Sequence, residues 1–318
     1  MKSTSRVLAA LCCLLVLSIA LPASAANIAW VSFHSADGTP STNAGTAGFT
    51  QAPDVGYTNA LTAAGHTVTR VVTQDSPLTP EKIATLNASD LIIIGRSVAS
   101  GHYQQPAESL FWNTTITKPI INTGAYTMRN TRLGMYTGGT IPDTVNPVRM
   151  TAVNPSHPIF AGISLDGSNT MVNTYADPVN LTFGANNLQR GISVVTQPIV
   201  AGGQLIGTLP VMTGTPPATV AGAAIALFPP GTVMDTDDTI GTDPTDVENV
   251  LGGYRMIFLT GSREHDGLTS EGSGIYDLSA DGGRMFLNAV NFMLAIPEPS
   301  SAMLLAFAVA GLGMLRKR

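Results

Sequence analysis

Ser97 is the residue of this chain whose neighbours best suit a nucleophile. It lies in the stretch Gly95-Arg-Ser-Val-Ala99, directly after four apolar residues. A serine nucleophile is often carried on a sharp strand-to-helix turn with the pattern G-x-S-x-G. Gly95 supplies the first glycine, whereas Ala99 takes the place of the second. The pattern is incomplete, so a serine hydrolase is the less favoured interpretation.

A serine nucleophile also needs a histidine base, oriented by an acid, within hydrogen-bond reach. The candidate bases are His34, His102 and His265, and the candidate acids are Glu264 and Asp266. Sequence spacing does not by itself bring these groups together. Two further histidines are interpreted structurally. His157 lies between two prolines and is expected to stabilise a turn, and His66 opens a predicted strand and is expected to be half-exposed.

Other polar residues follow the predicted strands at the points where each strand ends. In open α/β sheets, ligands bind outside the carboxyl ends of the strands. The residues at these ends are Ser32, His34 and Asp37; Arg96, Ser97 and His102; Asn122, Thr123 and Tyr126; and Arg263, Glu264, His265 and Asp266. The candidate binding residues among them are Arg96, Asn122, Tyr126, Arg263 and Glu264. The favoured alternative is that these are ordinary polar loops, in which arginines pair with nearby carboxylates.

The most acidic stretch could hold a metal ion. It contains Asp235, Asp237, Asp238, Asp243 and Asp246. Carboxylate oxygens are the ligands that calcium prefers, but an EF-hand loop needs glycine at its sixth position and glutamate at its twelfth. Ile240 and Asp246 stand there instead, so an EF-hand is excluded. A solvated acidic loop is the favoured interpretation and an irregular calcium site the alternative, and no other cofactor is expected.

Composition excludes several further classes of site. The two cysteines, Cys12 and Cys13, lie close to the N-terminus, and residues 26–296 contain none. Disulfides, thiolate metal sites and a cysteine nucleophile are therefore excluded there. In the same range two Lys and nine Arg face twenty Asp and Glu, a net charge of −9. Such an acidic chain is not expected to bind nucleic acid. The five glutamates of this range form no recognisable glycosidase pair.

Strands and helices alternate in the first half of the chain, and these elements must position the polar residues above. Apolar runs and alternations predict strands at 27–33, 66–72, 90–95 and 118–124, and helices at 54–64, from 79, near 106–112 and at 125–133. Residues 34–52 are predicted to form a long loop. This alternation predicts a doubly wound, mostly parallel α/β sheet over residues 27–135.

The pattern changes between about residues 145 and 235. Three segments there resemble strands separated by Gly and Pro turns: Ile192–Ile199, Gln204–Leu209 and Ala223–Phe228. We expect a β-rich insertion that extends the same sheet with antiparallel strands. A buried strand at 254–260 and an amphipathic helix at 278–294 then complete one α/β domain over residues 26–296.

Four segments resemble the class I glutamine-amidotransferase-like fold in its ThuA-like branch. They are Asp90–Ser97, Lys118–Asn122, Asn154–Gly162 and Asp281–Val290. The resemblance implies a flavodoxin-like, mostly parallel sheet, and it suggests a carbohydrate-directed hydrolase. Amidotransferases of this family use a cysteine at a strand-to-helix elbow. This chain has no such cysteine, so amidotransferase chemistry is excluded.

The N-terminal residues 1–25 have the pattern of a secretory signal peptide. Lys2 and Arg6 precede an apolar stretch, and Ala23-Ser-Ala25 supplies the small residues that signal peptidase recognises. We expect cleavage after Ala25.

The C-terminal residues 297–318 resemble the PEP-CTERM sorting signal of Gram-negative bacteria. Pro297, Glu298 and Pro299 precede an apolar run from Ala302 to Leu315, and Arg316, Lys317 and Arg318 end the chain. The run has fourteen residues, fewer than the ~17–25 that comfortably span a bilayer. The resemblance implies a short transmembrane helix, recognition by an exosortase, and transfer to the cell surface or exopolysaccharide matrix. An ordinary membrane anchor is the alternative.

Together these patterns predict an exported surface protein. Signal peptidase and an exosortase are its expected partners during export, and surface polysaccharide is a candidate partner afterwards. A non-catalytic binding or structural module is the favoured function, and a ThuA-like hydrolase is the alternative. The two differ in whether six side chains converge in one pocket: His34, Arg96, Ser97, His102, Arg263 and His265.

Overall fold

A computed structural model describes residues 25–74, 78–104, 106–144, 147–177, 179–183, 186–213, 218–234, 249–261 and 270–296. Nearly all of the expected signal peptide, the whole sorting tail 297–318 and the acidic stretch 235–246 lie outside these residues, as do Arg263, Glu264, His265 and Asp266. Within the described ranges, no helix is long and apolar enough to cross a membrane.

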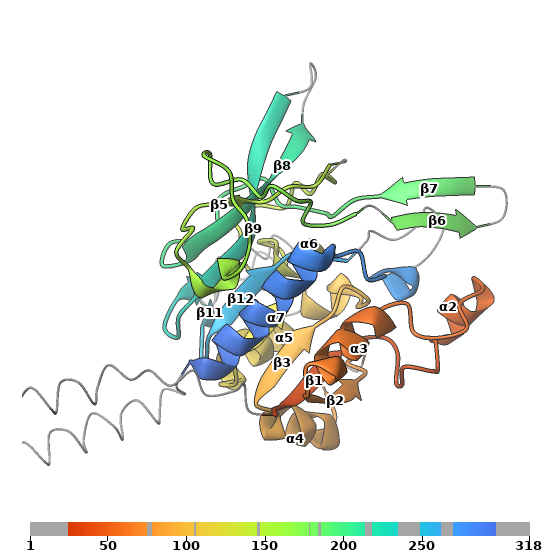
Figure 1. Cartoon of the computed structure of the whole chain (residues 1–318). Helices are drawn as coiled ribbons and strands as arrows, with labels where there is room; N and C mark the ends of the chain where they lie inside the picture. The colour runs from red at the N-terminus through yellow and green to blue at the C-terminus, as the bar shows by residue number, and fades with distance from the viewer. Residues whose placement is uncertain are drawn as a thin grey trace, which may run out of the picture.

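The centre of the fold is an eight-stranded, mostly parallel sheet (Figure 1). Its order is β2-β1-β3-β4-β12-β9-β8-β5. The strands from β2 to β12 in this order run parallel, and β9, β8 and β5 are antiparallel to their neighbours. The bounds are β1 (Asn27–Val31), β2 (Thr67–Val71), β3 (Leu91–Ile94), β4 (Ile120–Asn122), β5 (Thr151–Ala152), β8 (Gln204–Thr213), β9 (Ala218–Phe228) and β12 (Arg255–Phe258). The α/β prediction is confirmed.

Burial along the strands explains where each one lies in the sheet. All four residues of β3 and of β12 are buried, because both faces of these strands are covered. In β2 exposed and partly buried residues alternate, and its only buried residue is Val71. That pattern suits an edge strand, with solvent on one side.

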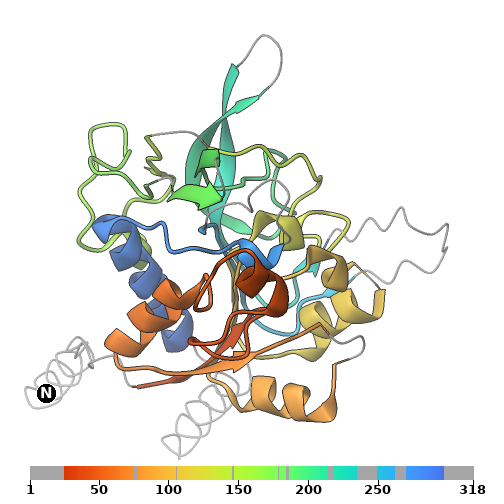
Figure 2. The same cartoon turned by 90° about the vertical axis from the view of Figure 1, so that its right-hand side faces the viewer.

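Helices cover both faces of the sheet (Figure 2). One face carries α3 and α7, whose side chains Tyr57 and Phe286 meet at 5.6 Å between ring centroids. The other face carries α4, α5 and the π-helical turn η2 that continues α5. The bounds are α3 (Val55–Ala63), α4 (Pro80–Ala88), α5 (Pro106–Leu110), η2 (Phe111–Thr115), α6 (Ala125–Met128) and α7 (Ala280–Ala295). Thr79 caps α4 through its side chain, with Pro80 at the first position, as its sequence predicts.

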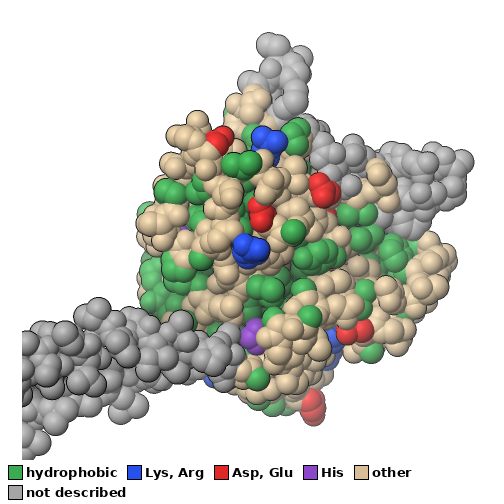
Figure 3. Space-filling view, in the orientation of Figure 1, with side chains coloured by type: hydrophobic (Ala, Val, Ile, Leu, Met, Phe, Trp, Pro, Cys, Tyr) green, Lys and Arg blue, Asp and Glu red, His purple; other side chains and the backbone are tan. Residues whose placement is uncertain are grey.

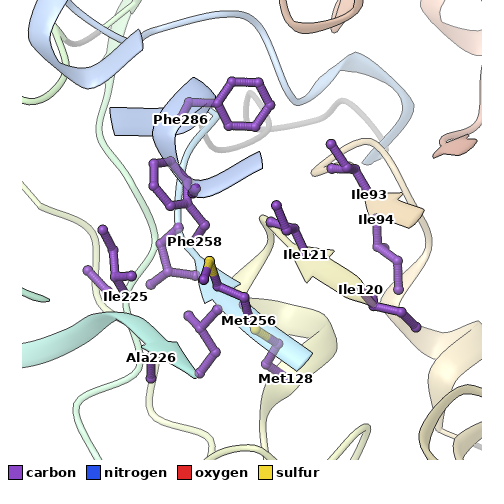
Figure 4. Close-up of a cluster of buried hydrophobic side chains, with 14 of the residues drawn as sticks. Ile93, Ile94, Ile120, Ile121, Met128, Ile225, Ala226, Met256, Phe258 and Phe286 are labelled. Carbon is purple, nitrogen blue, oxygen red and sulfur yellow. The ribbon is translucent and has the colours of Figure 1, made fainter. Parts of the chain in front are cut away.

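One hydrophobic core passes from the parallel half of the sheet into the antiparallel half. Figure 4 shows Ile121 of β4, Met256 and Phe258 of β12, and Ile225 of β9 packed together under Phe286 of α7. All five side chains are buried. The β-rich segment therefore shares its core with the parallel strands and extends their sheet, as expected from the sequence.

The prediction of a strand at residues 192–199 is wrong. Residues 192–199 form only isolated bridges, between Ser193 and Asp143 and between Ile199 and Tyr136. The segment packs over β9 instead: a Cβ atom on Gly222 would lie 2.3 Å from Val194 Cγ1. Apolar residues here are buried by packing on the sheet, so their hydrophobicity does not indicate strand pairing.

The remaining elements are short. Two antiparallel hairpins stand outside the main sheet, and a one-turn helix lies in the loop expected at 34–52. The bounds are α2 (Thr42–Thr46), β6 (Val179–Phe183) with β7 (Asn186–Arg190), β10 (Val233–Met234) with β11 (Asn249–Val250), and the 3₁₀ turns η1 (Ser100–Tyr103), η3 (Pro158–Phe160) and η4 (Ser270–Gly272). Figure 1 shows the tip of β8 and β9 and the β6–β7 hairpin projecting from the domain.

Both ends of the described domain lie at the amino edge of the parallel strands. Asn27 opens β1 there, and α7 runs back from the carboxyl edge to end at Ala295 on the same lower side of Figure 1. The polar residues that follow the strands lie at the opposite, carboxyl edge.

Candidate functional site

Ser97 and His34 meet at the carboxyl edge of the sheet. His34 follows β1 and Ser97 follows the adjacent β3, and His34 Nε2 lies 3.0 Å from Ser97 Oγ. These strands are neighbours at the point where the strand order reverses, which is where α/β sheets bind ligands. Two of the predicted catalytic candidates are thus brought together. Both side chains are fully buried, with an exposed fraction of 0 %.

The hydrogen bonds of His34 run in the direction opposite to that of a catalytic base. The Ser41 backbone N–H donates to Nδ1 at 3.0 Å. In a neutral imidazole with Nδ1 as acceptor, the proton is on Nε2, which therefore donates to Ser97. Ser97 Oγ in turn donates to the backbone oxygens of Ser270 at 3.2 Å or Glu271 at 3.3 Å. His34 thus cannot accept the proton of Ser97 in this arrangement.

Burial keeps His34 neutral. It lowers the pKa of the imidazole, and this effect exceeds the opposing attraction of the Asp54 carboxylate. A triad would need an acid on Nδ1 to hold the ring in the opposite tautomer. The Ser41 N–H takes that position. The pair therefore has the geometry of a buried structural contact.

Asp54 organises a second polar cluster beneath this pair. Its Oδ2 accepts from Trp30 Nε1 at 2.8 Å and from Ser32 Oγ at 2.7 Å. Its Oδ1 lies 2.9 Å from Arg70 Nη2, and Arg70 Nε contacts Asp37 Oδ1 at 2.6 Å. The Asp54 side chain is fully buried and that of Arg70 is 4 % exposed. The carboxylate is thus committed to holding β1, β2 and α3 together.

Asp277 forms a third cluster at the end of β12. Its Oδ1 accepts from the hydroxyls of Tyr57 at 2.9 Å and Thr260 at 3.1 Å, and from the Gly261 N–H at 3.1 Å. The two hydroxyl oxygens also lie in contact with each other, but each hydroxyl has a single proton and gives it to Asp277. Burial raises the pKa of Asp277 to about 6 despite these donors, and burial followed by the charge of Asp277 raises the pKa of Tyr57.

Sequence reasoning missed the central carboxylates of both clusters, Asp54 and Asp277, although it named Ser32 and Asp37 of the first. The sequence marks Asp54 only as the start of a helix, and it singles out neither Arg70 nor Asp277 for a site. No local motif identifies them, because Asp54 and Arg70 are sixteen positions apart and Asp277 lies 220 positions from Tyr57. Strand order brings these groups together, and only the fold reveals it.

The predicted binding residues Arg96, Tyr126 and Asn122 lie at the same edge. The Arg96 guanidinium carbon lies 4.9 Å from the centroid of the Tyr126 ring, a cation–π distance. Asn122 is fully buried, and its Oδ1 accepts from Thr127 Oγ1 at 2.8 Å and from the Gly124 N–H at 3.2 Å. Asn122 therefore shapes the turn from β4 into α6, which begins at Ala125.

Among the described residues, the other predicted histidines do not join Ser97. His102 Nδ1 lies 3.3 Å from the backbone oxygen of Thr73, and His102 lines a cavity beside α4 and α5. His157 Nδ1 accepts from the Ile159 N–H at 3.3 Å, which confirms its role in a turn. His66 is only 5 % exposed, so the expectation of half-exposure is wrong; the turn that precedes β2 folds it inward.

One hollow beyond the ends of β1 and β3, the switch-point hollow, leaves no room for a water molecule. It is lined by Ser32, Phe33, Thr73, Gln74, Val98, Ala99, His102 and Tyr103. Within the described ranges no three His, Cys, Asp or Glu side chains are grouped as a metal site. The acidic stretch from Asp235 to Asp246, the alternative calcium site, lies outside the described residues. On the face shown in Figure 3, charged side chains are scattered singly.

No family model and no curated protein matches this chain. Among solved structures, it is similar to one described as "Cytoplasmic Protein STM3548 from Salmonella typhimurium", with 10 % sequence identity and a TM-score of 0.41. That likeness covers 83 % of this chain and 98 % of the other. A TM-score this low supports no conclusion about fold or function.

Proposed function

We propose that this chain is an exported surface or matrix protein whose α/β domain binds or supports other components and does not catalyse a reaction. The proposal joins two independent lines of support. The pattern of both chain ends favours export and sorting, and the geometry at the carboxyl edge favours a non-catalytic domain.

The observation that carries the non-catalytic interpretation is the contact between His34 and Ser97. Its 3.0 Å distance would suit a nucleophile and base, but the Ser41 N–H on Nδ1 places the imidazole proton toward the serine. Both side chains are fully buried, so a substrate carbonyl would not reach the hydroxyl. Reversing the tautomer would leave the Ser41 N–H facing an N–H and would cost that hydrogen bond. The Ser97 hydroxyl would also have to turn away from the backbone oxygens of Ser270 and Glu271 to donate to Nε2.

The strand order supports the finer proposal about fold family. The parallel strands follow the order β2-β1-β3-β4-β12, which is the flavodoxin-like 2-1-3-4-5 arrangement when numbered among themselves. That order suits a glutamine-amidotransferase-like domain of ThuA-like type. The antiparallel strands β9, β8 and β5 would then be an addition at one edge.

The position of the domain ends supports the proposal about sorting. Asn27 and Ala295 lie at the amino edge, so a signal peptide and a PEP-CTERM tail would both leave from that side. A tail held in the inner membrane before exosortase recognition would point the carboxyl edge and the β8–β9 projection away from the bilayer. Surface polysaccharide is the partner class that we propose for the delivered protein.

The alternative is a carbohydrate-directed hydrolase of ThuA-like type, and the close approach of Ser97 to His34 is the observation that favours it. It would require the His34 imidazole to adopt the opposite tautomer and the buried Ser97 to become accessible to substrate. Substrate recognition by Arg96 and Tyr126 at the same edge would then follow.

Two measurements test these proposals. Fractionation of the native host should find the full chain at the cell surface and a form lacking residues 297–318 elsewhere; surface retention of the shortened form contradicts sorting. A fluorophosphonate probe should leave the folded protein unlabelled. Labelling that disappears in Ser97→Ala, but persists in Ser273→Ala, contradicts the non-catalytic proposal. Ser273 is the matched control, because it is also fully buried and lies at the same edge.

A further inference from the structure

A cavity of about 280 Å³ lies on the sheet face opposite α3 and α7. It is enclosed by α4 on one side and by η1, α5 and η2 on the other, which lie on the same side of the sheet (Figure 2). The cavity shares Thr73 and His102 with the switch-point hollow and shares no residue with the two carboxylate clusters. Unlike the switch-point hollow, it has room for a ligand.

The walls of this cavity are mainly apolar. Trp112, 2 % exposed, lies at its inner side, and Leu78, Ile83 and Phe111 continue the lining. Ala107, Leu110 and Thr115 are exposed, so the cavity opens to solvent along the outer side of α5 and η2. Ligand cavities of this kind, apolar with a few polar groups, are the usual sites for small molecules.

The volume sets the size of the occupant. Apolar cavities of about 150 Å³ take up one benzene molecule. A cavity of about 280 Å³ therefore has room for a molecule of roughly two fused rings. It is too small for a helix, whose diameter with side chains is about 10 Å or more.

The polar groups of the lining set the chemistry. His102 Nδ1 faces the Thr73 backbone oxygen at 3.3 Å, and a carbonyl can only accept, so Nδ1 donates; in the neutral ring Nε2 is then an acceptor. The one carboxylate among the described lining residues is Glu108, and no lysine or arginine is among them. An anionic ligand is therefore disfavoured, and a hydrogen-bond donor on the ligand is favoured.

We infer that this cavity is a binding site for a small, neutral, largely apolar molecule of about two fused rings that carries one N–H or O–H donor. The side chains of Phe111 and Trp112 in the lining provide contact area, and His102 Nε2 accepts the donor. The site goes beyond the proposed surface function and does not depend on how the protein is exported.

The test uses 5-fluoroindole, which has the required size and one N–H, with the purified full chain and fluorine NMR. We expect saturable broadening of the fluorine signal. 5-Fluoroindole-3-acetate, which carries the same ring and an added CH₂–carboxylate group, should bind at least about tenfold more weakly, because no cation lines the described cavity. The N-methyl derivative, which lacks the donor, should bind about 2- to 10-fold more weakly.

Two alanines provide matched variants. Ala107→Phe places a ring at the exposed mouth and should weaken binding of 5-fluoroindole by at least about tenfold. Ala63→Phe makes the same change at an exposed position of α3 on the opposite face and should leave binding unchanged. If Ala107→Phe does not fold, Thr115→Phe at the same mouth replaces it.

Three results would overturn the inference. They are the absence of saturable broadening up to the solubility limit of 5-fluoroindole, equal binding by the mouth variant and wild type, and equal binding of the neutral and anionic indoles. These outcomes are independent of the fractionation and labelling experiments, so failure of this inference leaves the surface proposal standing.

Discussion

Asp277→Asn should make the protein more stable at neutral pH. The carboxyl group is buried, and its Oδ1 accepts three hydrogen bonds, from Tyr57, Thr260 and Gly261. An asparagine keeps an oxygen at this position for all three donors and carries no charge. The variant therefore keeps the hydrogen-bond acceptor, which stabilises the fold, and removes the buried charge, which destabilises it.

The size of the effect follows from the pKa. Burial raises the pKa of Asp277 from 3.8 to about 6 in the folded state. Between these values the folded protein holds a proton that the unfolded chain has lost, so this contribution to stability is complete below about pH 3.8 and disappears as the pH rises through 6. A shift of this size corresponds to about 3 kcal/mol. Burial of the new amide offsets about 1 kcal/mol of the gain. We therefore expect the free energy of unfolding of Asp277→Asn to exceed that of wild type by about 2 kcal/mol at about pH 7.5.

Urea unfolding at about 25 °C, followed by circular dichroism between about pH 4 and pH 7.5, measures the difference. The advantage of Asp277→Asn should fall to near zero, or reverse slightly, at about pH 4, where wild-type Asp277 is protonated in the folded protein. Asp277→Ala is the matched control: it removes the acceptor, leaves three donors without one, and should destabilise at every pH by about 2–4 kcal/mol. The reasoning is refuted if the difference between wild type and Asp277→Asn does not change with pH, or if the variant is less stable at neutral pH.

Three further substitutions test the other structural assignments by urea unfolding. Arg255 is buried and donates to five backbone oxygens, those of Lys118, Tyr254, Trp112, Asn113 and Ile116. Arg255→Met leaves these buried acceptors without a donor and should cost about 3–5 kcal/mol, and Arg255→Lys should cost less; equal costs would contradict this account. Ser97→Ala removes the bond from His34 and should cost about 1 kcal/mol, whereas unchanged stability with loss of a hydrolytic activity would favour the enzyme alternative. Gly222→Ala would place Cβ 2.3 Å from Val194 Cγ1 and should cost about 1–3 kcal/mol; an unchanged midpoint would show that residues 192–199 do not pack against β9.

The parallel half of the fold could be predicted from the sequence because its signals are local. The run Leu91–Ile94 is apolar on both faces, and a strand covered on both faces needs such a run. Thr79 and Pro80 mark a helix start by capping geometry alone. The same reasoning fails at 192–199, where Val194 and Val195 are buried by lying on a sheet face. A segment that pairs as a strand and a segment that only packs on a sheet face show the same run of hydrophobic residues. Only the tertiary structure distinguishes the two.

The candidate site was predictable in position and not in function. The rule that ligand-binding residues follow parallel strands placed His34 and Ser97 at one edge of the sheet, and the fold brings them to 3.0 Å. Whether that contact is catalytic depends on which nitrogen carries the proton, and the Ser41 N–H decides it. Ser41 has no feature in the sequence that would mark it. Proton positions depend on backbone groups whose location the sequence pattern does not reveal.

The ionisable groups at the carboxyl edge share one arrangement. Asp54, Asp277 and His34 are each buried and hydrogen-bonded, and each ties a strand to a neighbouring loop or helix. In a catalytic cleft such groups would face a common space, whereas the described switch-point hollow cannot hold a water molecule. The described ionisable residues at this edge therefore hold strands to their neighbouring loops and helices. The cavity beside α4 and α5 is a described feature that has both the volume for a ligand and an opening to solvent.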